Sequence, residues 1–143
     1  MSVVYFTDRD LGLKFGEILR DSGLTVERFR DHFKRDDCPD EEWLQSVGQR
    51  GWVALTHDTR IRYKPNELAA VKRNNVRLLV VIGAAPYPEL ALSFVRTHHR
   101  VEAFLAREQA PFIAKVYRAS PGDLAKNPGA AGRVERWWPS SQE

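Results

Sequence analysis

Three aspartates stand at positions where their carboxylates could bind a metal ion. Asp8 and Asp58 each come after a short run of apolar and β-branched residues, and Asp40 stands directly after Pro39 at the start of a segment with helical spacing. Carboxylates that lie close together raise one another's pKa unless a cation compensates their charge. Mg²⁺ and Mn²⁺ prefer oxygen ligands, so these acids predict a site for one of the two ions. An ion held there could activate water and orient a phosphodiester.

Basic residues follow the last of these acids in the stretch THDTRIRYK. Arg60, Arg62 and Lys64 stand within six positions of Asp58. Guanidinium groups suit phosphate oxygens, so we expect the three side chains to bind the phosphates of a polyanionic substrate. The overall charge of +3 is too small to identify a partner by itself.

Acids at strand ends and helix starts often have local roles instead. A turn residue or a helix cap uses the same side chains, and we expect Asp10 to cap the first helix rather than to bind metal. Glu41 is the alternative to Asp40 as the acid of this helix start whose side chain faces the other two aspartates. The other acids in this region, Asp36, Asp37 and Glu42, are expected to be solvated charges.

Alternating strand and helix patterns position these acids. Strands that alternate with helices indicate a parallel sheet covered on both faces, so the predicted fold is a three-layer α/β/α domain with a mainly parallel five-stranded sheet. In such sheets ligands bind outside the carboxyl ends of the strands, where Asp8 and Asp58 should emerge. Strands are expected at 2–7, at the start of LTVERFRDHF, at 52–58, at 77–82 and around FIAKVY, with helices at 10–22, 40–49, 65–74 and, as one or two helices, 88–106.

Length and composition indicate one domain with an extension. The 143 residues suit a single α/β domain at 1–120, followed by a Gly/Pro/Ala-rich segment at 121–143 that ends in Trp137 and Trp138. We expect this tryptophan pair to dock on protein, and exposed aromatic residues favour a homodimer. No apolar run is long enough to span a membrane, no signal peptide is evident, and Cys38 is the only cysteine. A cytoplasmic protein is therefore expected.

Three motifs together resemble the PIN-like domain family. They are FTDRDLG at the end of the first strand, PDEEW at the start of the second helix and LTHD at the end of the third strand. They are most similar to the short subgroup of VapC-type toxins. The resemblance implies a Mg²⁺- or Mn²⁺-dependent ribonuclease with Asp8, Asp40 and Asp58 as metal-site acids, held inactive by a cognate antitoxin. Many family members have a further acid after the next strand, where this chain has Gly83-Ala84-Ala85.

Other functions use similar residues. A phosphoacceptor signalling domain would need an acidic first strand end, an aspartate after the third strand and a lysine on the last, a set that Asp8, Asp10, Asp58 and Lys115 could imitate. A non-catalytic adaptor would depend on the tryptophan pair and not on the acids. A zinc site would draw on His32, Cys38 and His57, which lack the paired short spacing typical of zinc ligands.

Overall fold

The computed structural model describes residues 3–33, 35 and 38–140, and within them the chain forms a six-stranded sheet. The strand order is β2-β1-β3-β4-β5-β6. The first five of these strands are parallel, and only β6 is antiparallel to its neighbour β5. The strands are β1 (Val4–Thr7), β2 (Thr25–Arg28), β3 (Val53–Thr56), β4 (Arg77–Val81), β5 (Phe112–Val116) and β6 (Val134–Trp138).

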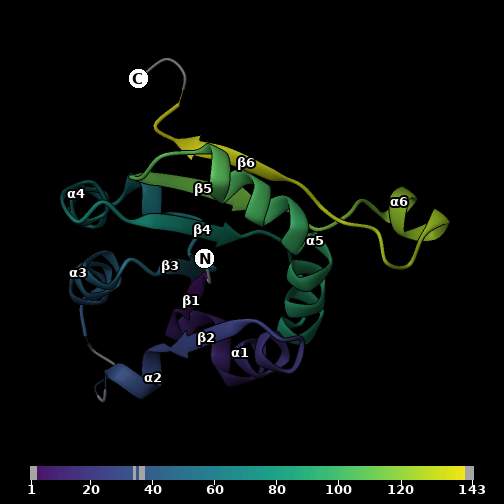
Figure 1. The fold of residues 1–143 in the computed structure, drawn as a ribbon, viewed down its shortest axis with the longest axis horizontal. Coiled ribbons are helices and arrows are strands. Elements are labelled where there is room, and N and C mark those ends of the chain that lie inside the picture. Colours follow the sequence, from purple (N-terminus) through teal and green to yellow (C-terminus); the bar gives the residue numbers. More distant parts are fainter. Residues whose placement is uncertain (1–2, 34, 36–37, 141–143) are drawn as a thin grey trace.

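Helices cover both faces of this sheet, as Figure 1 shows. One layer consists of α1 and α5, which pack against each other, and the opposite layer consists of α3 and α4. The helices are α1 (Gly12–Asp21), α2 (Phe29–His32), α3 (Asp40–Arg50), α4 (Pro65–Arg73), α5 (Tyr87–Arg107) and α6 (Pro121–Lys126), with 3₁₀ turns η1 (Arg9–Leu11) and η2 (Ile61–Tyr63).

Alternation along the strands divides the core between the two layers. On β1, Tyr5 faces the α1 and α5 layer, whereas its neighbour Phe6 packs with Trp43 of α3 on the other face. This follows from the two-residue period of a strand. Every residue of β3 is buried because β3 lies inside the sheet with helices on both sides. The strand ends are therefore held rigidly at one edge.

The predicted α/β/α fold with a mainly parallel sheet is confirmed, with one strand more than predicted. The expected helix at 88–106 is a single helix, α5, because its apolar face runs without interruption along the sheet. The strand expected at the start of LTVERFRDHF is β2, and the short helix α2 follows it directly. Asp36 and Asp37, expected to be solvated, lie outside the described residues.

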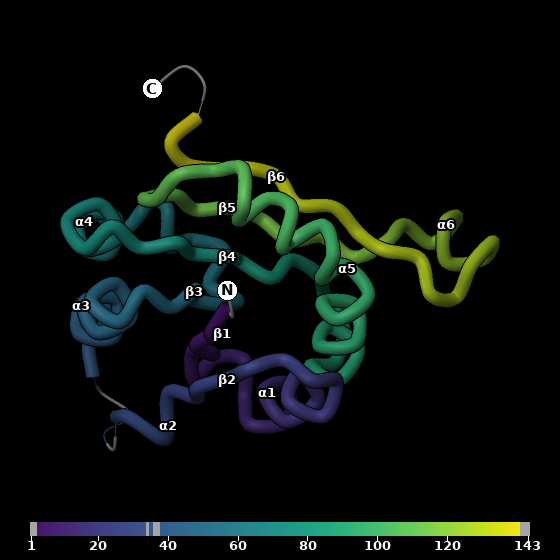
Figure 2. Tube along the Cα trace, in the orientation of Figure 1, coloured from purple at the N-terminus to yellow at the C-terminus, as the bar shows by residue number. Residues whose placement is uncertain are grey.

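The additional strand comes from the C-terminal segment. Figure 2 shows the chain leaving β5, passing through α6 and returning along β6. Trp137 and Trp138 on β6 pack against the α3 and α4 side of the core, so within this chain the pair docks on its own sheet. Lys115 and Tyr63 contact the Trp137 ring, at 4.3 and 5.7 Å from its centroid. Among the described helices, none combines the length and apolarity that a bilayer crossing requires.

Candidate active site

Asp8 lies directly after β1 and is almost fully buried, at 5% relative exposure. Its backbone is extended, and its carboxylate accepts a hydrogen bond of 2.7 Å from the N–H of Arg9, so Asp8 caps the turn η1. This local bond fixes the direction of the side chain. A buried carboxylate with so few donors is unusual and indicates a special electrostatic environment.

Thr56, the last residue of β3, connects Asp8 to Asp10. Its hydroxyl oxygen lies 2.9 Å from an oxygen of Asp8 and 3.0 Å from an oxygen of Asp10. A threonine hydroxyl has one proton, so it donates to only one of the two carboxylates at a time. The N–H of Asp58 donates to the same hydroxyl oxygen over 3.2 Å, and the N–H of His57 donates to Asp10.

These surroundings leave uncompensated negative charge at the two aspartates. Burial, and next the neighbouring charge of Asp10, raise the pKa of Asp8 to about 7, and the charge of Asp40 adds to the effect. Burial also raises the pKa of Asp10, against the hydrogen bonds from Thr56 and His57, and Asp58 raises it further. The four acids therefore act on one another electrostatically, although they are distant in sequence.

The carboxylate of Asp58 is paired with Lys64. The Lys64 ammonium lies 2.6 Å from one oxygen of Asp58, and the N–H of Arg60 donates to the other over 2.9 Å. This bond to Asp58 raises the pKa of Lys64. Asp58 thus lies beside the Asp8 and Asp10 pair but is already neutralised.

Asp40 is the first residue of α3 and is also partnered. The indole N–H of Trp43 donates to it over 2.9 Å, and the guanidinium of Arg9 lies 3.6 Å away. Arg9 is held over the Phe29 ring and donates to the backbone oxygen of Cys38. Asp40, not Glu41, is the helix-start acid whose charge acts on Asp8.

The prediction that Asp10 caps the first helix is wrong. Asp8 caps η1, and the Asp10 carboxylate turns back toward β3 instead, where Thr56 and His57 supply its hydrogen bonds. The sequence pattern Asp-X-Asp directly after a strand, together with a threonine at the end of a neighbouring strand, is the signal that could have identified this pair.

The predicted phosphate-binding residues have different surroundings. Arg60 is exposed and its side chain is available to a ligand, whereas the Lys64 ammonium is engaged by Asp58. Arg62 donates to the backbone oxygen of Trp137 over 3.2 Å and its guanidinium lies over Tyr63. The C-terminal strand therefore fixes one side of this basic stretch.

A cavity of about 340 Å³ opens directly beside Asp8. Its wall contains Phe29, and three arginines surround it, Arg9, Arg28 and Arg30. Because the Arg9 guanidinium already lies over the Phe29 ring, the feature of this cavity that suits a nucleotide is its arginines, which bind phosphates.

The structure does not support the phosphoacceptor site or the zinc site. Lys115 lies on β5, which β4 separates from β3, and its ammonium lies over the Trp137 ring of β6, so Lys115 contacts none of the acids in the phosphoacceptor set. Burial, with a hydrogen bond to Glu42, raises the pKa of Cys38 to about 11, which disfavours the thiolate that zinc requires. The Nδ1 atom of His57, the third residue of the zinc set, lies 2.7 Å from the backbone oxygen of Val81 at the end of β4.

The profile of the PIN-like domain family matches residues 3–83. That match covers more than half of the 143 residues. The protein belongs to the PIN-like domain family. Searches of curated protein sequences and of solved structures gave no match. The matched region contains β1 to β4 and the four aspartates, and PIN-like domains are commonly nucleases, so a nuclease function is the one to test.

The donor atoms suit a hard divalent cation, but the acids are not yet grouped around one. Within residues 3–33, 35 and 38–140, no three His, Cys, Asp or Glu side chains are arranged to hold a metal ion. The reason is that Asp40 and Asp58 face Arg9 and Lys64. The raised pKa of Asp8 and of Asp10 marks the negative charge that a cation would offset. The residues fit Mg²⁺ or Mn²⁺ by chemistry, provided that Asp58 exchanges its ammonium partner for the ion.

Proposed function

We propose that the protein is a Mg²⁺- or Mn²⁺-dependent ribonuclease that cleaves RNA phosphodiester bonds. The observation that carries the proposal is the pair formed by buried Asp8 and part-buried Asp10 on one threonine hydroxyl, with the pKa of Asp8 raised to about 7. Such a pair is costly to keep ionised unless a cation binds it. Family membership supports the same function.

Asp8, Asp10 and Asp58 would hold the ion, and Asp40 would complete the site or orient a water. When bound, the ion supplies Lewis-acid activation of water and of the phosphodiester. Thr56 orients the carboxylates of Asp8 and Asp10 through its hydroxyl, and the N–H groups of Asp58 and His57 donate to this arrangement. The site is partly enclosed, which strengthens every charge interaction within it.

Basic side chains around these acids would bind the RNA. Arg60 is exposed beside Asp58, and Lys64 would become available for a phosphate once Asp58 binds the ion. The cavity beside Asp8 would take a nucleotide next to the cleaved bond, with Phe29 in its wall. Phosphate contacts position a substrate without reading its sequence, so the target RNA depends on loop geometry.

We further propose that the protein is the toxin of a type II toxin-antitoxin pair, in the cytoplasm. The support is the resemblance of its three motifs to VapC-type toxins. A cognate antitoxin and a homodimer remain predictions. The toxin proposal is tested by asking whether expression of the native chain, but not of Asp10→Asn, arrests growth.

Cleavage of a mixed-sequence single-stranded RNA tests the ribonuclease proposal. The native chain should cleave with Mn²⁺ and not with a chelator, and Asp10→Asn and Asp58→Asn should each lose about 100-fold or more in rate. Asp21→Asn at the exposed end of α1 is the matched control and should cleave normally. Cleavage by Asp10→Asn at the native rate would contradict the proposed site. A folded native chain that binds Mn²⁺ but does not cleave would favour an adaptor.

A further inference from the structure

A second cavity, of about 510 Å³, lies at the same sheet edge as the acids but over β4 and β5. Arg100, Arg118 and Arg133 line it, together with the acid Asp123. Its floor includes Ile82 and Gly83, which directly follow β4. None of these arginines belongs to the acidic site, and the cavity lies apart from the one beside Asp8.

Two of the arginines are held in place by the surrounding chain. Arg100, on α5, donates to the backbone oxygen of Gly132 over 2.6 Å. Arg133 stacks on the Tyr117 ring at 4.0 Å, and the N–H of Tyr117 donates to the backbone oxygen of Arg133. Held side chains lose less conformational entropy when they bind a ligand, which favours a binding function.

Arg118 reaches the cavity because residue 83 is a glycine. Gly83 has a φ of +138°, and a Cβ there would lie only 2.7 Å from the Arg118 Nε atom. The absence of a side chain lets Arg118 lie against the end of β4. A guanidinium therefore lies against the chain that follows β4.

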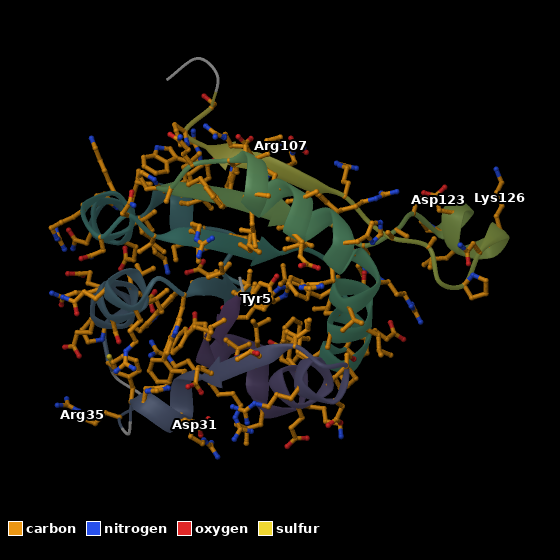
Figure 3. The ribbon with its side chains drawn as sticks, in the orientation of Figure 1. Tyr5, Asp31, Arg35, Arg107, Asp123 and Lys126 are labelled. Carbon is orange, nitrogen blue, oxygen red and sulfur yellow. The ribbon has the colours of Figure 1, made fainter. Side chains whose placement is uncertain are left out.

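The cavity is net positive. Across residues 3–33, 35 and 38–140, no carboxylate forms an ion pair with Arg100 or Arg118. Arg133 has an exposed partner, Glu135, at 3.6 Å, and exposed pairs of this kind are weak. Asp123 lies on α6, which projects from the body of the molecule in Figure 3. Three guanidinium groups against one lining acid suit an anion with several oxygens.

The strand order links this cavity to the acids. Because β3, β4 and β5 are parallel neighbours, their carboxyl ends lie at one edge. Neighbouring strands are about 4.8 Å apart, so the end of β5 is about 10 Å from the end of β3. A single RNA strand laid along the edge would pass from Asp58 toward Arg118.

We propose that the cavity lined by Arg100, Arg118 and Arg133 is a phosphate-binding subsite for the RNA backbone on one side of the cleaved bond. The inference rests on the proposed function because RNA must reach the acids. It adds a site that binds substrate without taking part in the cleavage step. Its test therefore measures binding with a chelator present, when metal-dependent cleavage is stopped.

The test is the affinity of a fluorescent mixed-sequence single-stranded RNA for native protein, Arg118→Gln and Arg73→Gln over a range of salt concentrations. Arg118 is exposed, so its replacement should leave the fold intact, which a melting curve checks. One phosphate contact contributes about 0.7 to the slope of log affinity against log salt. Arg118→Gln should lower this slope by about 0.7. When the salt is reduced from 1 M to 0.1 M, the affinity of the variant should therefore rise about five-fold less than the affinity of the native chain.

Arg73→Gln is the matched control because Arg73 is also exposed but ends α4, which leads into the start of β4 at the opposite edge. It should bind as the native chain does. The inference is overturned if Arg118→Gln keeps the native slope, if Arg73→Gln loses as much, or if native protein does not bind the RNA. Cleavage by the native chain with Mn²⁺ is scored separately, so a correct ribonuclease assignment with a wrong subsite is recognised.

Discussion

Asp8→Asn should remove a pH dependence from the stability of the protein. In the native chain, the Asp8 pKa is raised from 3.8 to about 7. The folded protein therefore holds a proton that the unfolded chain releases between these values, so folding becomes less favourable as the pH rises through that window. At 1.36 kcal/mol per pKa unit, the free energy of unfolding at pH 8 is about 4 kcal/mol lower than it is below pH 3.8.

The variant cannot ionise at this position, so its stability should fall less steeply over the same window, and the remaining slope comes from Asp10, whose pKa is also raised. Asn keeps the oxygen that accepts from Arg9 and can donate to Thr56, but its second N–H finds no partner among the described side chains, at a cost of about 1 to 3 kcal/mol. The variant should therefore have about the native stability at pH 5 and should be the more stable protein at pH 8, by about 2 kcal/mol. For a chain of this size that corresponds to a melting temperature about 4 to 8 °C higher.

Urea unfolding at pH 5, 6, 7 and 8 with a chelator measures this difference. Asp21→Asn is the control, since Asp21 is exposed at the end of α1, and its curve should run parallel to the native one. If the curves for native protein and Asp8→Asn also ran parallel, Asp8 would be ionised in the folded chain throughout. The charge argument for the site would then be refuted.

Four other substitutions test separate parts of the account. Thr56→Val should destabilise the fold at pH 8 by about 1 to 3 kcal/mol in urea unfolding, because the carboxylates of Asp8 and Asp10 lose the hydroxyl that they share; unchanged stability would contradict that link. Lys64→Gln should tighten Mn²⁺ binding in calorimetry several-fold, since the ammonium 2.6 Å from Asp58 competes with the ion; weaker binding would contradict this. Gly48→Ala should lower stability by about 1 to 3 kcal/mol despite the better helix propensity, because the new Cβ meets the backbone oxygen of Asn74. The new Cβ of Gly16→Ala meets the flexible Arg28 side chain at 3.2 Å and the Thr7 hydroxyl at an ordinary contact distance of 3.5 Å, so this substitution should be neutral or stabilising.

The sheet and the edge that bears the acids could be predicted from local patterns. Apolar strands that alternate with helical spacing allow few arrangements, and Asp8 and Asp58 follow two strands that prove to be parallel neighbours. β6 could not be foreseen in the same way. It pairs with β5 only after an intervening loop and helix, and such non-local pairing leaves little trace in a Gly/Pro-rich sequence.

The hydrogen-bond and ion-pair partners of the acids could not be predicted from the sequence. Whether Asp10 caps a helix or turns toward Thr56 depends on a strand 46 residues away. The pairing of Lys64 with Asp58 depends on the course of η2, which brings a residue six positions later back to the acid. Residue types predicted the chemistry of the site, whereas tertiary packing decided which charges are already compensated.

The most direct measurement of the central claim is Mn²⁺ binding followed by electron paramagnetic resonance, with native protein, Asp10→Asn and the exposed control Asp21→Asn. The account predicts a bound ion in the native chain and the control, and an affinity at least about ten-fold weaker in Asp10→Asn. Equal binding by all three proteins, or none by the native chain, would contradict it.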